Sequence, residues 1–177
     1  MQKLISEDYV KQIKQMHEEK VNFGAIGCRH VDKIIKLAQV EKTQDILDYG
    51  CGKSTLARNL PFTIQQYDPG IEKYSDMPRP ADIVVCTDVL EHIEPDCLES
   101  VLVHMASLTK VAGYFTACTM EAKKHLPDGR NAHLIIKPAK WWVNKLYEYF
   151  EVMSFQKQPE ELVVVVEPLN FKGIKHA

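Results

Sequence analysis

The chain has 177 residues, of which 45% are hydrophobic and 26% charged, a composition typical of one folded domain with a sizeable core. Its formal charge of -2 excludes a strong general attraction to nucleic acid or to an anionic membrane. Five cysteines without C-x-x-C spacing argue against a disulfide framework or a structural zinc site. Because no apolar run approaches about 20 residues and no signal peptide opens the chain, we expect a cytoplasmic protein.

Two helices are predicted before the first strand. Residues 6–20 carry apolar side chains at helical spacing behind a serine N-cap. A break at residues 22–27 separates them from a second helix near residues 28–40. Apolar stripes of this kind are typical of helices that pack on the edge of a sheet.

The stretch at residues 45–54, D-I-L-D-Y-G-C-G-K-S, predicts a strand that turns into a helix at the nucleotide site of an open α/β sheet. Side chains at Gly50 and Gly52 would strain this turn and hold a ligand away from the backbone. A dinucleotide fingerprint requires a glycine where Thr55 stands, and a phosphate-binding P-loop requires one where Leu47 stands. Both of those motifs therefore fail at one diagnostic position.

An acid two residues before the first glycine resembles motif I of the class I S-adenosylmethionine-dependent methyltransferases, D-x-G-x-G-x-G. Asp48, Gly50 and Gly52 match this motif, while Ser54 replaces its last glycine. The resemblance covers about residues 30–168 and implies S-adenosylmethionine as the cofactor. It also implies that the Asp48 carboxylate acts on the amino group of the methionine moiety, directly or through water.

A second acid ends the next predicted strand. A short helix at residues 53–60 is followed by a strand at residues 62–67, which ends in Asp68 and Pro69. Asp68 stands 20 residues beyond Asp48, close to where a second-strand acid reaches the ribose hydroxyls in this sheet topology. A carboxylate with two acceptor oxygens suits two hydroxyls.

Only 13 residues separate Asp68 from Asp82, and they include three prolines, so a full helix and a strand cannot both fit. We therefore expect an abbreviated crossover. The family resemblance implies an acid that contacts adenine in this region. Asp76 is the candidate.

The predicted strand at residues 82–86 ends at Thr87 and Asp88, where ligands bind in open α/β sheets. The following D-V-L-E-H, residues 88–92, resembles the same segment of many small-molecule methyltransferases, including the quinone-pathway O-methyltransferases. The predicted cofactor-binding residues are therefore Asp48, Tyr49, Gly50, Cys51, Gly52, Asp68, Pro69, Asp76, Thr87, Asp88 and Val89.

A long polar loop at residues 120–137 follows the predicted strand at residues 113–119. Residues 120–140 carry five basic and two acidic side chains, a local charge of +3, which favours an anionic group on the substrate. Functional residues concentrate in such loops. The candidate substrate-binding residues are His125, Asp128, Arg130, Asn131 and His133.

The chain closes with a helix from Pro138 and two strands, residues 149–155 and 162–166, joined by a turn too short for anything but antiparallel pairing. We therefore predict a doubly wound α/β fold of Rossmann-like type, with seven strands, mostly parallel, and an antiparallel C-terminal hairpin strand. One methyltransferase domain, 1–177, is expected. Its N-terminal helices (1–44) are candidates for a lid, with a hinge at residues 23–27. They are followed by a core (45–168), which contains the substrate loop (120–137), and by a tail (169–177).

The predicted reaction is methyl transfer from S-adenosylmethionine to an oxygen or nitrogen atom of a small, anionic or nucleotide-like acceptor. His92 is the first candidate for a general base, because it follows a strand end and imidazole titrates near neutral pH. His133 and His125 are the second candidates. The core consumes most of the chain and leaves no room for a DNA-reading module. The sequence assigns no metal ligand, no membrane partner and no oligomeric state.

Three alternatives remain open. Asp88, Glu91, His92 and His133 resemble the acids and histidines with which the small-RNA 3′-terminal 2′-O-methyltransferases bind a divalent ion. A non-catalytic S-adenosylmethionine-binding subunit would share the cofactor site and form no product. An NAD oxidoreductase is disfavoured by Thr55.

Overall fold

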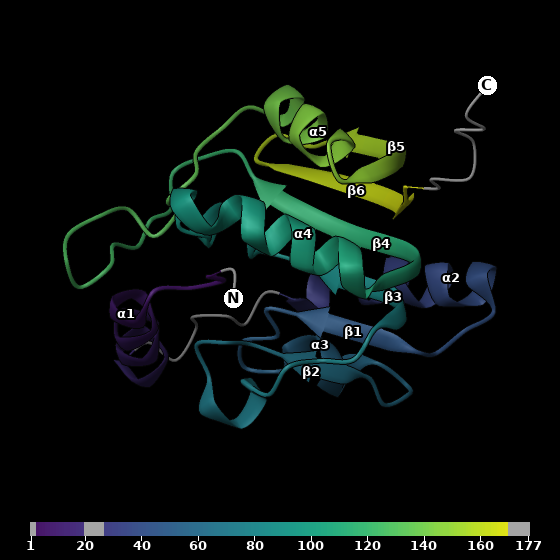
Figure 1. Ribbon diagram of the computed structural model, residues 1–177, viewed down its shortest axis with the longest axis horizontal. Helices are drawn as coiled ribbons and strands as arrows, with labels where there is room; N and C mark the ends of the chain where they lie inside the picture. Colours follow the sequence, from purple (N-terminus) through teal and green to yellow (C-terminus); the bar gives the residue numbers. More distant parts are fainter. Residues whose placement is uncertain (1–2, 20–26, 170–177) are drawn as a thin grey trace, which may run out of the picture.

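A computed structural model describes residues 3–19 and 27–169. Its helices and strands alternate along the chain, as in an α/β fold (Figure 1). They are α1 (Glu7–Glu19), α2 (Val31–Glu41), β1 (Ile46–Tyr49), α3 (Thr55–Asn59), β2 (Gln65–Tyr67), β3 (Ala81–Cys86), α4 (Leu98–Leu108), β4 (Thr109–Cys118), α5 (Ala139–Tyr147), β5 (Phe150–Lys157) and β6 (Glu161–Pro168).

The described residues form one six-stranded sheet in the order β2-β1-β3-β4-β6-β5. The strands β2, β1, β3 and β4 pair in parallel, and β6 runs antiparallel to both β4 and β5. The predicted mixed α/β sheet with its C-terminal hairpin is confirmed, with six strands rather than seven. Between β2 and β3 stands only a short 3-10 helix, Glu72–Tyr74, because the prolines of this stretch disfavour regular structure.

Helices cover both faces of the sheet. Alternate strand residues point to opposite faces, so that Leu47 packs with α4 and α5 on one face while Ile46 packs with α2 and α3 on the other. Trp142 of α5 is completely buried in the first of these cores. The two apolar layers fix the sheet and thereby the loops at its ends.

The helix α1 and the loop 120–137 lie at the same end of the sheet, on the left in Figure 1. Tyr9 and Ile13 of α1 form a small apolar cluster with Leu126 and Ala132 of the loop. The hydroxyl oxygen of Ser6 accepts the N–H of Tyr9 at 3.0 Å, which confirms the predicted N-cap. The predicted hinge at residues 23–27 falls outside the described residues, apart from Gly27, as does the tail from residue 170.

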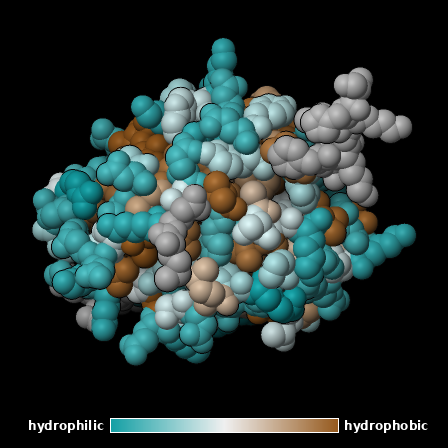
Figure 2. Space-filling model, in the orientation of Figure 1, coloured by the Kyte–Doolittle hydropathy of each residue, from teal (hydrophilic) through white to brown (hydrophobic). Residues whose placement is uncertain are grey.

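Hydrophobic residues on the face shown in Figure 2 lie in small groups between hydrophilic ones. Within the described ranges, every helix is too short or too polar to cross a bilayer.

Candidate active site

A cavity of about 600 Å³ opens at the carboxyl ends of the parallel strands. One side, which we call the strand-tip wall, is formed where β1, β2 and β3 end, at residues 49, 50 and 52, 68–70 and 88–89. The opposite side, the loop wall, is formed by the N-terminal segment with α1, by residues 92–94 and by the loop 120–137. Ligands of open α/β sheets bind at this edge.

Gly50 gives the strand-tip wall its shape. Its φ is +79°, and a Cβ at this position would lie 2.4 Å from Cγ2 of Val89. The N–H groups of Gly50 and Cys51 donate to the carbonyl of Tyr67 at 2.7 and 3.1 Å, which closes the loop onto β2. Ser54, which stands where the motif has its last glycine, keeps the left-handed turn with a φ of +59°. That conformation costs a side-chain-bearing residue about 1 kcal/mol.

Asp68 ties two glycine loops together. Its Oδ2 accepts the N–H of Gly52 and its Oδ1 accepts the N–H of Gly70, both at 2.9 Å. Burial raises the pKa of Asp68, and the two N–H donors oppose that shift. The carboxylate lines the cavity and keeps further lone pairs that can accept two hydroxyls.

Asp48 lies behind the cavity rather than on its surface. It is only 3% exposed, while its neighbours Tyr49 and Gly50 line the cavity. Burial, and then the charge of Asp68, raise the pKa of Asp48 to about 7. A cation close to this carboxyl would favour its ionised form.

The segment after β3 brings Asp88 and Val89 to the strand-tip wall. Asp88 has a φ of +59°, and its N–H donates to Oγ1 of Thr116 at 3.1 Å. Non-glycine residues in this conformation are concentrated at functional sites. The predicted cofactor residues that line the cavity are Tyr49, Gly50, Gly52, Asp68, Pro69, Asp88 and Val89. Cys51 and Thr87 are buried outside the lining, and Asp76 is exposed outside it.

Two of the three candidate bases, His92 and His133, meet at the loop wall, whereas His125 lies outside the cavity lining. The rings of His92 and His133 are edge to face with centroids 4.8 Å apart. Nδ1 of His92 lies 2.7 Å from the carbonyl of Ala132, and Nδ1 of His133 lies 2.6 Å from that of Met120. A carbonyl only accepts, so these contacts place a proton on each Nδ1. Burial lowers the pKa of His92, which favours its neutral form.

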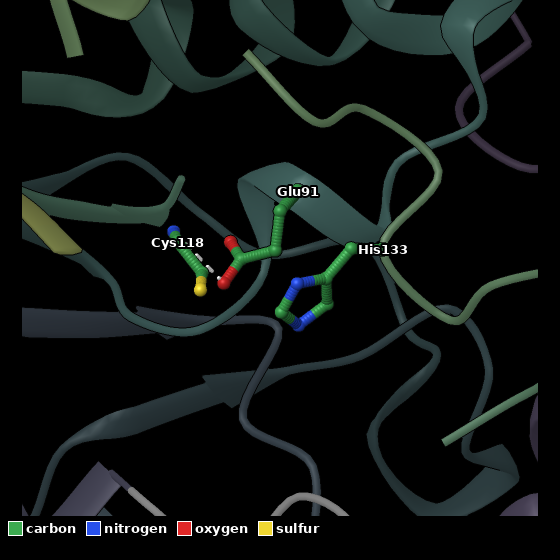
Figure 3. Close-up of side chains that lie close together, drawn as sticks. All are labelled: Glu91, Cys118 and His133. Carbon is green, nitrogen blue, oxygen red and sulfur yellow. Dashed lines mark hydrogen bonds between the residues drawn. The ribbon is translucent and has the colours of Figure 1, made fainter. Parts of the chain in front are cut away.

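Glu91 is completely buried next to these histidines. Its Oε1 accepts the N–H of Cys118 at 3.0 Å, while its Oε2 has no hydrogen-bond partner among the described residues. Burial, and then Asp88, raise the pKa of Glu91 to about 8. Figure 3 shows the side chains of Glu91, Cys118 and His133 pointing toward one another. The sequence drew attention to Glu91 through the D-V-L-E-H segment and through its resemblance to the metal-binding acids of the small-RNA methyltransferases. It gave no signal for Cys118.

Of the five predicted substrate-binding residues, only His133 lines the cavity. The exposed Asp128 and Arg130 pair with each other, with Oδ2 of the aspartate 2.6 Å from the guanidinium. His125 is exposed and forms an isolated β-bridge with Asn131. The side chain of Asn131 binds the backbone of the loop itself: its Oδ1 accepts the N–H groups of Ala122 and His133 at 3.0 and 2.9 Å. These side chains shape the loop, whereas Lys123 and Lys124 line the cavity.

The helix α1 is fastened to the segment after β3 by contacts that the sequence did not predict. The hydroxyl of Tyr9 donates to the carbonyl of His92 at 2.7 Å. The hydroxyl and the N–H of Ser6 donate to the two carboxylate oxygens of Glu94 at 2.7 and 2.8 Å. The position of α1 at the cavity thus depends on contacts between residues more than 80 positions apart in the chain.

A family model described as a methyltransferase domain matches residues 19–176. This chain belongs to that family. The predicted resemblance to the class I methyltransferases and the predicted enzyme class are thereby confirmed for this methyltransferase domain. No curated protein sequence matches the chain at a significant level.

Several solved structures share the fold. TehB from Haemophilus influenzae is 12% identical with a TM-score of 0.54, over 77% of this chain and 61% of that one. DhpI, in complex with SAH, is 14% identical with a TM-score of 0.59, over 92% and 98% of the two chains. The 1,6-didemethyltoxoflavin-N1-methyltransferase of Burkholderia thailandensis, with its acceptor and S-adenosylhomocysteine bound, is 16% identical with a TM-score of 0.59, over 91% and 85%.

Proposed function

We propose that this protein transfers a methyl group from S-adenosylmethionine to an oxygen or nitrogen atom of a small acceptor. The observation that carries the proposal is the strand-tip wall, where Gly50, Asp68 and Asp88 converge on one cavity. Gly50 leaves no room for a Cβ, and Asp68 presents lone pairs to the cavity, which suits a nucleoside laid against the backbone. Similar structures contain S-adenosylmethionine or its product, as in DhpI and the toxoflavin enzyme.

The roles of the cofactor-binding residues follow from this placement. Asp68 would accept the ribose hydroxyls, and the backbone at residues 49–52 would support the methionine part. Asp48, buried behind this loop, would stabilise the ammonium group through water or the loop itself. Asp76 remains a prediction for the adenine contact, although its side chain is exposed outside the cavity lining.

Bound S-adenosylmethionine supplies a methyl group that its sulfonium already activates. The protein therefore has to hold the acceptor in line and exclude water, tasks that α1 and the loop wall support. His92, with its lowered pKa and a proton on Nδ1, is suited to take a proton from the acceptor. His133 at its edge is the second candidate for that base.

We propose a small acceptor with an anionic group. Lys123 and Lys124 lie on the loop wall with one acid of the same loop, Glu121, and the N-terminal segment adds apolar side chains such as Ile5 and Tyr9 to this wall. This combination of basic and apolar side chains suits a compact molecule with an apolar body and a negative group. The toxoflavin enzyme carries a small heterocyclic acceptor in its structure. None of the five cysteines, all within the described residues, forms a disulfide bond, and on that basis we propose the reducing cytoplasm as the protein's compartment.

The test is calorimetric titration with S-adenosylmethionine, followed by detection of S-adenosylhomocysteine with a panel of small acids, phenols and nucleotides. Asp68→Asn should weaken cofactor binding roughly 10- to 100-fold, because charged hydrogen bonds contribute about 1.5–3 kcal/mol each. The matched Asp76→Asn should leave the affinity unchanged, because the Asp76 side chain is exposed outside the cavity lining. A larger effect at Asp76 would restore its predicted adenine contact.

Two results would replace the proposal. Cofactor binding without product for any acceptor would favour the non-catalytic binding subunit. Binding of a nicotinamide cofactor, with no heat from S-adenosylmethionine, would reject methyl transfer itself.

A further inference from the structure

Five side chains with metal-binding atoms gather where the two walls of the cavity meet. Donor atoms of Glu91, Cys118 and His133 lie within 4.8 Å of one another, and so do those of Asp88, Glu91 and His92. Glu91 belongs to both groups. The first group comes from three separate segments of the chain, and its side chains converge in Figure 3.

Glu91 itself points to a ligand. It is 0% exposed, and its Oε2 is buried without a hydrogen-bond partner among the described residues. Leaving such a group desolvated and unpaired is unfavourable, and buried carboxylates are normally paired or bound to a metal. The other oxygen, Oε1, is already held by the N–H of Cys118, so the side chain is fixed in position.

We propose that Glu91, Cys118 and His133 form a binding site for one divalent transition-metal ion. A carboxylate oxygen, a thiolate and an imidazole together suit Zn²⁺, Co²⁺ or Fe²⁺ better than Mg²⁺, which takes oxygen ligands. The carbonyl of Met120 holds the ring of His133, as backbone carbonyls commonly do for metal-binding imidazoles. Tetrahedral bonds of about 2.0–2.3 Å separate ligand atoms by roughly 3.3–3.8 Å, so donor atoms that lie within 4.8 Å of one another need to close by no more than about 1.5 Å.

Asp88 and His92 form a second group with Glu91 and are the further oxygen and nitrogen ligands within reach. The site differs from the sequence expectation of no metal ligand. It also differs from the set considered for an RNA enzyme, because Cys118 contributes sulfur. Since Cys118 and His133 line the cavity, the ion would face the acceptor and could bind one of its oxygens. That consequence rests on the proposed function, whereas binding of the ion does not.

The experiment is titration of chelator-treated full-length protein with Co²⁺, followed by calorimetry and by absorption spectroscopy. We expect one ion per chain and a sulfur-to-cobalt charge-transfer band. Cys118→Ser should abolish the band, and Glu91→Gln should weaken binding at least about 10-fold. Cys28→Ser, which removes an exposed cysteine outside the cavity lining, should change neither the band nor the affinity.

The proposal is wrong if the wild-type protein binds no stoichiometric Co²⁺, or if the band persists in Cys118→Ser. Circular dichroism and thermal unfolding check that each variant folds. If Glu91→Gln does not fold, His133→Asn takes its place in the binding test. S-adenosylmethionine titrated into the same samples separates the two proposals. Cofactor binding without Co²⁺ binding rejects the metal site alone, and the reverse result rejects methyl transfer alone.

Discussion

The two walls of the cavity are built in different ways. The strand-tip wall is held mainly at backbone N–H groups: those of Gly50 and Cys51 donate to the carbonyl of Tyr67, and those of Gly52 and Gly70 donate to the carboxylate of Asp68. The loop wall is fixed by side chains that bond across the fold, such as Tyr9 to the carbonyl of His92. A backbone-built wall tolerates few substitutions, whereas a wall built from side chains can change its specificity while the fold is retained.

The largest effect on the strand-tip wall is expected at Gly50. We expect Gly50→Ala to weaken S-adenosylmethionine binding by at least about 30-fold and to destabilise the fold by about 2–4 kcal/mol. The new methyl group would collide with Val89 and would force a left-handed residue to carry a Cβ. Calorimetry and denaturant unfolding measure the two effects.

Gly129→Ala is the matched control. Gly129 also has a positive φ, +88°, but a Cβ there would meet nothing within 4 Å. This variant should lose only the conformational term, about 1 kcal/mol, and keep its cofactor affinity. Equal losses in both variants would show that backbone strain, and not the contact with Val89, accounts for the effect at Gly50.

The buried acid behind the strand-tip wall gives a pH dependence. The pKa of Asp48 is about 7 in the folded protein and about 3.9 in an unfolded chain, so the folded state binds the proton more tightly. Its contribution to stability is greatest below pH 4 and is lost as the pH rises toward 7. Asp48→Asn should remove this slope and stabilise the ligand-free protein at pH 8 by about 2–4 kcal/mol, measured by urea unfolding at several pH values.

Asp45→Asn tests a carboxylate whose contribution to stability changes with pH in the opposite direction. Arg79, and Lys110 after it, hold the pKa of Asp45 below its usual range through short ion pairs. That contribution is present above pH 4 and is lost on acidification, so the variant should be less stable at neutral pH, by less than about 1 kcal/mol. A parallel pH profile for both variants would contradict the assignment of the slope to Asp48.

A smaller effect is expected at the loop wall. Tyr9→Phe removes the hydrogen bond to the carbonyl of His92 and should cost about 1 kcal/mol of unfolding free energy. We expect KM for the acceptor to rise severalfold while the dissociation constant of S-adenosylmethionine stays within twofold. Tyr147→Phe, at a tyrosine that is 49% exposed, should change neither quantity. A weakened cofactor affinity in Tyr9→Phe would show that the two walls do not act separately.

The smallest expected effect is a gain in the stability of the fold. Ser54→Gly should stabilise the fold by up to about 1 kcal/mol, because Ser54 carries a side chain on a left-handed backbone. Lys42→Gly, at an exposed left-handed residue after α2, is the control for the backbone alone. No gain at either position would mean that the flexibility of glycine in the unfolded chain cancels the strain.

The strand-tip wall was within reach of the sequence because its parts are local. A strand, two glycines and an acid at fixed spacing specify the turn at residues 45–54, and the next acid follows from the parallel topology. The helices α1 and α5 and the C-terminal hairpin were likewise predicted from apolar spacing and short turns. The shortened crossover before β3 was predicted from its prolines.

The sequence by itself therefore determined the family, the mixed sheet and the residues that reach one edge of it, since carboxyl ends of parallel strands must meet there. Only the tertiary structure decided which loop side chains face the cavity. In the folded chain Asp128 pairs with Arg130, and the side chain of Asn131 bonds to the backbone of its own loop. Glu91, Cys118 and His133 lie close together. Such pairings depend on packing between segments far apart in the chain, for which local spacing carries no signal.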